Sequence, residues 1–384
     1  MINIVDIISM SGSRIKEIVT LLEEWFSTPQ NLDDLDQWLI DAEEVIYTFE
    51  LSEQEQLYVD TILDSYEEQF KLMLQRKQTP IVSKEYMDEL LSRKQTEQRT
   101  EEWYKQMTAI ISASELGNLF GSAYQRSKFV ISKTQPYYRR QQDLAVSSAR
   151  MSPFDWGIRF EPVVKLIYEH IHGAAIKELG RMIHQVDQRC TASPDGLIYE
   201  ATDPAKVGRL IEIKCPVTRE IDGTIPKDYY HQMQMQLHVT GLHACEYVEA
   251  SFTSVYNQEN MKEGPALYYG LIALVHRNVS VNGQHLYYMY GPVNCTEWEP
   301  MITEQDDSVL EIIPWRVYQW SEQTVHRSQE WWDKTHPLIE EFWRDVQKHK
   351  DGEFTVLEST RPAKKAKTND DKCMITFTRL DYHS

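Results

Sequence analysis

Two acidic residues and one lysine in the middle of the chain have the types and spacing that metal-assisted phosphodiester chemistry needs. Asp195 lies in the segment Ser193-Pro194-Asp195-Gly196, and Glu212 and Lys214 lie in the alternating segment Arg209–Cys215. Successive side chains of a strand point to opposite faces, so Glu212 and Lys214 are expected on one face of a strand. A carboxylate and an ammonium group would then point toward the same side of a sheet.

Turn residues between these segments predict a hairpin that brings the two carboxylates together. Leu197–Tyr199 has a short strand pattern, and residues 200–208 contain turn-forming Asp, Pro and Gly. Asp195 and Glu212 are equally far from the middle of that loop, so an antiparallel hairpin would set them opposite each other, in a register that the sequence does not fix. Two close carboxylates repel unless a cation lies between them, and Mg²⁺ suits such a pair. Lys214 could then position or deprotonate the attacking water.

Two predicted helices flank the hairpin. The first begins at Ser152-Pro153, and its expected buried stripe is Phe160, Val163, Val164, Ile167 and Ile171. Glu161 lies at the edge of this stripe, where a glutamate taken alone is most often solvated. The second helix is expected to run from Asp228, as its N-cap, to Gly241, as its C-cap. Gln234 is expected on its inward face, where it needs a hydrogen-bond partner.

The ordered set of short motifs resembles a known nuclease family. Pro194-Asp195 followed by Glu212-x-Lys214 matches the PD-(D/E)XK signature, and Ser193–Leu197, Glu212–Pro216 and Tyr230–Gln234 resemble the lambda-exonuclease branch, also called YqaJ-like viral recombinases or alkaline exonucleases. The resemblance covers residues 100–252 and implies an α/β (α+β) fold with a restriction-endonuclease-like αβββαβ core.

The resemblance also implies roles for individual residues. The metal ligands would be Asp195, Glu212 and the backbone carbonyl of Ile213, with Lys214 at the attacking water. Glu161, which ends a Trp-Gly-x-x-x-Glu pattern, and Gln234 would complete the shell of metal and water. The implied cofactor is Mg²⁺, for which Mn²⁺ can substitute, with two ions per site.

A further implied site holds the 5′-terminal phosphate of the substrate. Ser114 and Ser193 would contact this phosphate, although Ser114 is equally well placed simply to cap the following helix. Where the family commonly has the arginine that binds the phosphate, this chain has Met107. Either another residue such as Arg126 replaces that arginine, or the dependence on a 5′ phosphate is weakened.

The charge of the chain is unevenly distributed. The formal net charge is −19, and residues 1–99 hold 9 Lys and Arg against 21 Asp and Glu. Residues 124–160 are instead basic, so Arg126, Arg150 and Arg159 are expected to contact DNA, with a solvated basic surface as the alternative.

Composition indicates an intracellular protein in several parts. The five cysteines have no C-x-x-C pair, which suits a reducing compartment, and no apolar run approaches the length of a membrane span. The predicted parts are an acidic helical extension at residues 1–95, a nuclease domain at 100–350 and a polar, partly basic tail at 358–384. The protein is expected inside the infected host cell, in its cytoplasm or nucleus, and not secreted.

The resulting functional prediction is a metal-dependent 5′→3′ exonuclease acting on double-stranded DNA ends in viral or phage recombination, repair or replication. Its implied partners are duplex DNA with free ends and a single-strand-annealing protein, and oligomerisation is left open. An endonuclease or RNase on the same core, and a catalytically silent DNA-binding or adaptor protein, remain the alternatives.

Overall fold

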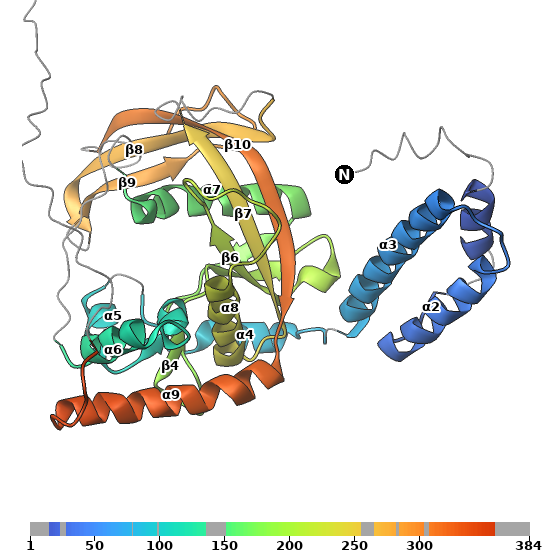
Figure 1. Ribbon diagram of the computed structural model, residues 1–384. Coiled ribbons are helices and arrows are strands. Elements are labelled where there is room, and N and C mark those ends of the chain that lie inside the picture. Colours follow the sequence, from blue (N-terminus) through green and yellow to red (C-terminus); the bar gives the residue numbers. More distant parts are fainter. Residues whose placement is uncertain are drawn as a thin grey trace, which may run out of the picture.

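The computed structural model describes residues 15–23, 28–78, 80–97, 100–135, 151–254, 265–281, 284–302 and 307–357. It combines helices with a mixed β-sheet, as the predicted α+β class requires (Figure 1). Within these ranges, none of the helices is long and apolar enough to cross a membrane. The basic segment 361–367 of the predicted tail lies outside the described residues.

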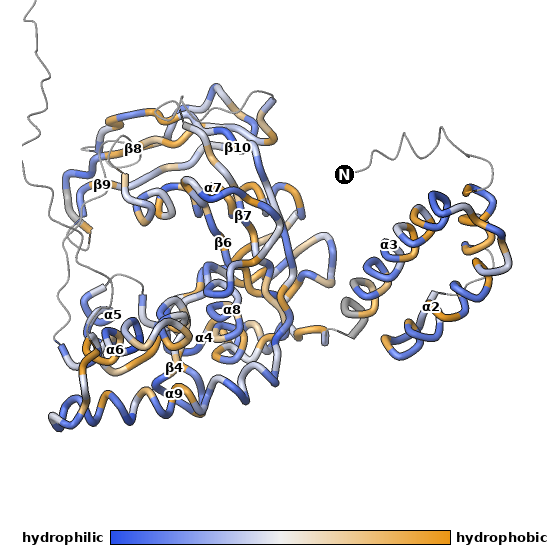
Figure 2. The backbone as a smooth tube through the Cα atoms, viewed as in Figure 1, coloured by the Kyte–Doolittle hydropathy of each residue, from blue (hydrophilic) through white to orange (hydrophobic). Residues whose placement is uncertain are grey.

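The N-terminal helices have a hydrophobic core of their own. A helical segment at residues 15–23, α2 (Leu32–Ile46) and α3 (Glu53–Gln78) enclose a cluster that includes Leu35, Trp38 and Leu74. Figure 2 shows hydrophobic and hydrophilic residues alternating along α2 and α3, as amphipathic helices require. The sequence Ser52-Glu53-Gln54-Glu55 predicts a capping box, and α3 begins with it, because the side chains of Ser52 and Glu55 accept hydrogen bonds from each other's backbone N–H groups. The predicted division of the chain into domains stays a prediction.

A seven-stranded sheet forms the centre of the remaining chain. Its strand order is β2-β5-β6-β7-β10-β8-β9, with β6 and β7 parallel and the other neighbours antiparallel. The strands are β2 (Ala175–Lys177), β5 (Gly196–Glu200), β6 (Leu210–Lys214), β7 (Ala244–Ser254), β8 (Tyr268–Val281), β9 (Gln284–Tyr290) and β10 (Ser308–His326). The long α7 (Pro153–His172) packs on one face, and α8 (Lys227–Thr240) packs on the other (Figure 1). The order α7, β2, β5, β6, α8, β7 is the expected αβββαβ core.

A second, three-stranded sheet attaches the N-terminal part of this domain to the core. Its strands are β1 (Ile111–Ser112), β4 (Cys190–Ala192) and β3 (Met182–Ile183), in the order β1-β4-β3. β1 pairs in parallel with β4, with Ser112 beside Thr191. The pairing brings the segment that follows β1 next to the loop 193–195, although the two are far apart in sequence.

Further helices complete the domain. They are α4 (Lys84–Ser92), α5 (Glu101–Lys105), α6 (Ala123–Ser132) and α9 (Gln329–Lys350), with short 3₁₀ turns η1 (Gln106–Thr108), η2 (Ala113–Leu119) and η4 (Pro204–Lys206). α4 contributes Met87 and Leu90 to the core that α8 also covers.

Local signals predicted the start of α7 and the end of α8. Ser152 caps α7 with Asp155 in a capping box, and Gly241 ends α8 in the left-handed conformation with φ of 76°. Asp228 is not the cap of α8, because the helix begins one residue earlier and Pro226 occupies the cap position. Ile171 is also not buried, since α7 extends past the edge of the sheet there and leaves the side chain 37% exposed.

The C-terminal half contains one wrong prediction of secondary structure. The hairpin of β8 and β9 is confirmed, while its turn residues Asn282 and Gly283 lie outside the described residues. A single helix over 321–350 was expected, but residues 321–326 belong to β10, and the helix begins after Ser328, which caps it. The reason is non-local: residues 321–326 pair with residues 244–249 of β7.

Candidate active site

The hairpin of β5 and β6 brings Asp195 beside Glu212, as the sequence predicted. Gly196 pairs with Ile211 and Leu197 with Leu210, so Asp195 precedes β5 directly opposite Glu212. Asp195 Oδ2 accepts a hydrogen bond of 2.7 Å from the backbone N–H of Ile213. This bond fixes the first carboxylate against the strand that carries the second.

Glu212 is completely buried and its carboxylate is held by three donors. Lys214 Nζ and Gln232 Nε2 donate to Oε1, the amide at 2.6 Å, and Gln236 Nε2 donates to Oε2 at 2.6 Å. A buried carboxylate is tolerated when its oxygens are bonded in this way.

Lys214 is the cation that faces both carboxylates. Burial alone would lower the pKa of its ammonium group, but the charges of Glu212 and Asp195 raise this pKa above the ordinary value. The ammonium group also lies 4.9 Å from the centre of the Tyr229 ring. Lys214 is therefore present as a charged donor in this arrangement.

The surroundings of Asp195 disfavour its charged form, in contrast to those of Lys214. Burial, and then the negative charges of Glu161 and Glu212, raise the pKa of the Asp195 carboxyl group well above its ordinary value, although Lys214 and the Ile213 N–H group oppose this. An additional positive charge at this position would relieve the repulsion.

The two carboxylates fit a hard divalent cation. No three metal-binding side chains within the described ranges converge to form a complete cage. Asp195 and Glu212 would then supply only part of the coordination, which is the usual situation for Mg²⁺, because this ion keeps water and substrate phosphates as its other ligands. The carbonyl of Ile213 as a third ligand stays a prediction.

These residues open onto one cavity of about 640 Å³. Of the predicted site residues it is lined by Ser114, Glu161, Ser193, Asp195, Glu212, Ile213 and Lys214. Glu161 projects from α7, where Lys165 lies 3.4 Å from its carboxylate. Five elements separated in sequence therefore converge on one space: η2, α7, the loop before β5, β6 and α8.

The prediction that Gln234 faces the site is wrong. Its amide bonds to the carbonyl of His326 at 2.7 Å and to the N–H of Ser328 at 2.8 Å, where β10 passes into α9. Gln232 and Gln236, four residues apart and therefore on one side of the helix, face Glu212 instead. The prediction failed because α8 has polar partners on two sides, Glu212 of β6 on one side and the junction of β10 and α9 on the other. The Gln-x-x-x-Gln spacing was the signal that could have identified the correct face.

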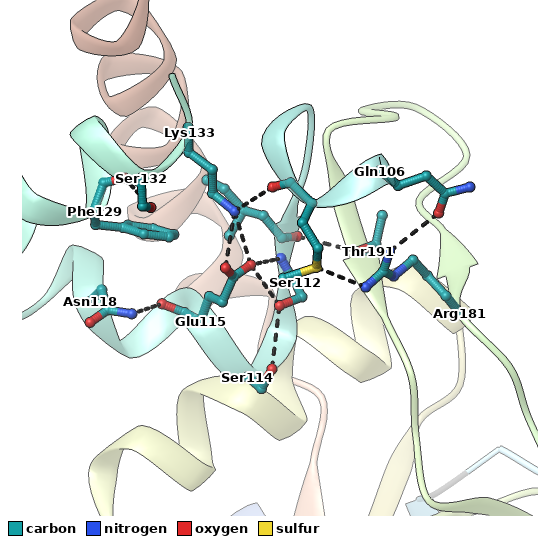
Figure 3. A network of polar contacts seen from close by, with 12 residues as sticks. Gln106, Ser112, Ser114, Glu115, Asn118, Phe129, Ser132, Lys133, Arg181 and Thr191 are labelled. Carbon is teal, nitrogen blue, oxygen red and sulfur yellow. Dashed lines mark hydrogen bonds and ion pairs between the residues drawn. The ribbon is translucent and has the colours of Figure 1, made fainter. Parts of the chain in front are cut away.

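The serine end of the cavity also differs from the expectation. Ser112, and not Ser114, caps the following turn, where it forms a capping box with Glu115. Ser114 is thereby exposed to the cavity, with its hydroxyl 3.3 Å from that of Ser112. Behind this turn, the buried ammonium group of Lys133 bonds to Glu115 and to the Met107 carbonyl (Figure 3).

Arg181 contacts Met107, the residue that this chain has where the family commonly has a phosphate-binding arginine. Its guanidinium group donates to the Met107 sulfur at 3.0 Å (Figure 3). It also donates to the Trp103 carbonyl at 2.6 Å and lies over the Trp103 ring. Arg181 lines the same cavity as Ser114. The sequence offered no local motif for this residue, because the bridge between Thr96 and Arg181 that positions it is non-local.

Arg126 and Arg159, two of the three arginines predicted to contact DNA, do not line the cavity. Arg126 forms ion pairs with Asp345 at 2.6 Å and Glu341 at 3.4 Å on α9. Arg159 is completely buried and donates to the Tyr288 hydroxyl at 3.1 Å, because its side of α7 packs against β9. Arg150 lies outside the described residues.

The αβββαβ core and its paired carboxylates with an adjacent lysine define the class of PD-(D/E)XK nucleases. Residues 102–243 match the model of the YqaJ-like viral recombinase domain. This segment of the chain is therefore similar to the YqaJ-like viral recombinase domain, as the motifs predicted.

Individual relatives are more distant. The chain is 29% identical over 172 residues to an uncharacterized protein of Acanthamoeba polyphaga mimivirus, a match that covers 40% of this chain and 29% of that protein. The chain thus spans less than a third of the length of this relative. The crystal structure of an alkaline exonuclease from Laribacter hongkongensis has 16% identity and a TM-score of 0.41, with 66% of this chain and 95% of that chain covered. The same enzyme in complex with dAMP has 17% identity and a TM-score of 0.39, with 66% and 98% covered.

Proposed function

We propose that the protein is a metal-dependent deoxyribonuclease that degrades double-stranded DNA from its ends in the 5′→3′ direction during viral DNA recombination, repair or replication. The observation that carries the proposal is the convergence of Asp195, Glu212 and Lys214 at one wall of an open cavity. The direction of degradation comes from the family resemblance.

The protein groups divide the chemistry between them. Asp195 and Glu212 would hold Mg²⁺, which when bound polarises the scissile phosphate and favours ionisation of water. Lys214, charged and directed at Glu212, would donate to the attacking water or to a phosphate oxygen. Glu161, on α7 and in the lining of the same cavity, would accept a hydrogen bond from that water.

The other end of the cavity would hold the terminal phosphate. Ser114, Ser193 and Arg181 all line the cavity. The guanidinium group of Arg181 is held by hydrogen bonds to the Trp103 carbonyl and the Met107 sulfur. We propose that Arg181, and not Arg126, binds the terminal phosphate in place of the family's arginine, whose position in this chain is occupied by Met107. Arg126 would have to give up its ion pairs on α9 to serve this role.

The test of the proposed function is Lys214→Ala on end-labelled duplexes. Loss of a positioned charge at a reacting phosphate or water typically lowers the rate by about 10²–10⁴-fold, while duplex binding should stay within about 2-fold. Lys206→Ala is the matched control, since Lys206 is another largely buried lysine paired with a glutamate, Glu246, but lies outside the cavity lining. Unchanged hydrolysis by Lys214→Ala would reject the proposal. Degradation of closed circles as fast as of linear duplexes would indicate an endonuclease instead.

A further inference from the structure

Helix α8 contributes two amide groups to one carboxylate of the candidate metal site. Gln232 and Gln236 lie one helical turn apart, and each donates to a different oxygen of Glu212 at 2.6 Å. Gln232 is partly exposed at the cavity wall, whereas Gln236 lies deeper, is completely buried and does not line the cavity. Gln236 therefore acts on Glu212 from behind, on the side away from the cavity.

The bonds to both oxygens restrain the carboxylate. If Glu212 rotated about its terminal torsion angle, Oε2 would leave Gln236, and Oε1 would leave Gln232 and Lys214. Oε1 accepts two of these bonds and Oε2 accepts one, so of the roughly four acceptor sites of the carboxylate the one that remains for a cation is on Oε2. The side chain is thus held in one orientation before any ligand arrives.

Gln236 is unfavourable for the stability of the fold if its side chain only fills space. Its Oε1 atom is buried without a hydrogen-bond partner among the described residues. An unsatisfied buried acceptor costs about 1–3 kcal/mol, which an apolar side chain of the same shape would avoid. Reversing the amide would point an oxygen at the Glu212 carboxylate, so the contact with Glu212 determines its orientation.

We infer that Gln236 is a positioning residue that fixes Glu212 for the divalent cation and thereby sets the affinity of the site for that ion. This inference rests on the proposed function, because it assumes that Glu212 is a metal ligand. Hydrogen-bond partners behind a metal ligand typically change metal affinity by about 10–100-fold when they are removed.

The experiment compares Gln236→Met with Gln234→Met in the full chain. Methionine has nearly the same shape as glutamine but cannot donate to a carboxylate. Gln234 is the matched control: it lies on the same helix and is equally buried, but its amide donates to the His326 carbonyl and accepts from the Ser328 N–H group instead of bonding to Glu212. Mn²⁺ is the probe, with free Mn²⁺ followed by electron paramagnetic resonance and folding followed by thermal denaturation without metal.

The expected result is a separation of the two variants. Gln236→Met should bind Mn²⁺ about 10–100-fold more weakly than the unaltered chain, whereas Gln234→Met should keep the affinity although its melting temperature falls. Equal Mn²⁺ affinity in all three proteins would overturn the inference, as would tighter binding by Gln236→Met. Gln236→Asn, which keeps the amide but is too short to reach Glu212, should show the same loss and serves if the methionine variant does not fold.

Asp195→Asn separates the two proposals. If the unaltered chain binds Mn²⁺ and Asp195→Asn does not, the metal site is established, and the result for Gln236→Met decides the inference alone. If the unaltered chain binds no Mn²⁺, both the inference and the proposed metal dependence are wrong.

Discussion

Replacing Asp195 by asparagine should stabilise the metal-free protein while abolishing its response to metal. Burial and the charges of Glu161 and Glu212 both disfavour the ionised form of Asp195, so a neutral amide of the same shape removes repulsion. The asparagine oxygen can still accept the 2.7 Å bond from the Ile213 N–H group, so the hairpin keeps its connection. The sign of the change in unfolding free energy therefore follows from the neighbours of this residue.

The magnitude can be bounded. Substitutions that relieve strain at a functional site commonly add about 0.5–2 kcal/mol of stability. For a domain of about 150–250 residues, each kcal/mol shifts the melting temperature by about 2–4 °C, so an increase of about 1–8 °C is expected. A ligand present at about 100 times its dissociation constant adds about 2.7 kcal/mol to the stability of a protein that binds it only when folded. The unaltered protein should show such a metal-dependent shift, and Asp195→Asn should not.

The assay is thermal denaturation with and without Mg²⁺ or Mn²⁺. Asp345→Asn is the matched control, because Asp345 is also a mostly buried aspartate but is paired with Arg126 at 2.6 Å. Its neutralisation removes an attraction and should lower the melting temperature both with and without metal. The reasoning is refuted if metal-free Asp195→Asn melts below the unaltered protein, or if metal stabilises both equally.

Two further predictions concern the phosphate end of the cavity and the dependence of stability on pH. Arg181→Met should reduce the hydrolysis of 5′-phosphorylated duplex ends toward the rate for 5′-hydroxyl ends, by about 10-fold or more, because the guanidinium group would no longer contact the phosphate. Arg126→Met, the control, should leave the ratio of the two rates unchanged. An unchanged ratio in Arg181→Met would exclude a contact between Arg181 and the phosphate. Burial lowers the pKa of His238 from an ordinary 6.5 to about 4, so the unfolded chain takes up a proton before the folded one does. The free energy of unfolding should therefore fall as the pH decreases from about 6.5 to about 4. Melting temperatures measured at several pH values should fall less steeply in His238→Gln than in the unaltered protein. Equal slopes would contradict the lowered pKa of His238.

The hairpin that carries the chemistry was predictable because its information is local. Asp195 and Glu212 lie on the two arms of one hairpin, and the turn residues between them predicted that they meet, while the structure supplied the register. The same holds for the caps of α3 and α7, where the residues that bond to each other are three positions apart.

Features that depend on distant partners could not be predicted in the same way. The inward side of α8 is defined by β6 on one flank and by the start of α9 on the other, so three alternate glutamines could not be assigned without knowing both neighbours. Residues 321–326 form a strand because they pair with residues 244–249 of β7. Arg181 reaches the cavity through its bridge to Thr96, a pairing that no window of sequence contains.

The three glutamines of α8 also lock the helix against turning about its long axis. A shift in phase by one residue is a rotation of 100°, which would withdraw Gln232 and Gln236 from Glu212 and at the same moment withdraw Gln234 from His326 and Ser328. The bonds of Gln234 to His326 and Ser328, next to the start of α9, thus hold α8 in the rotation at which Gln232 and Gln236 reach Glu212 of β6.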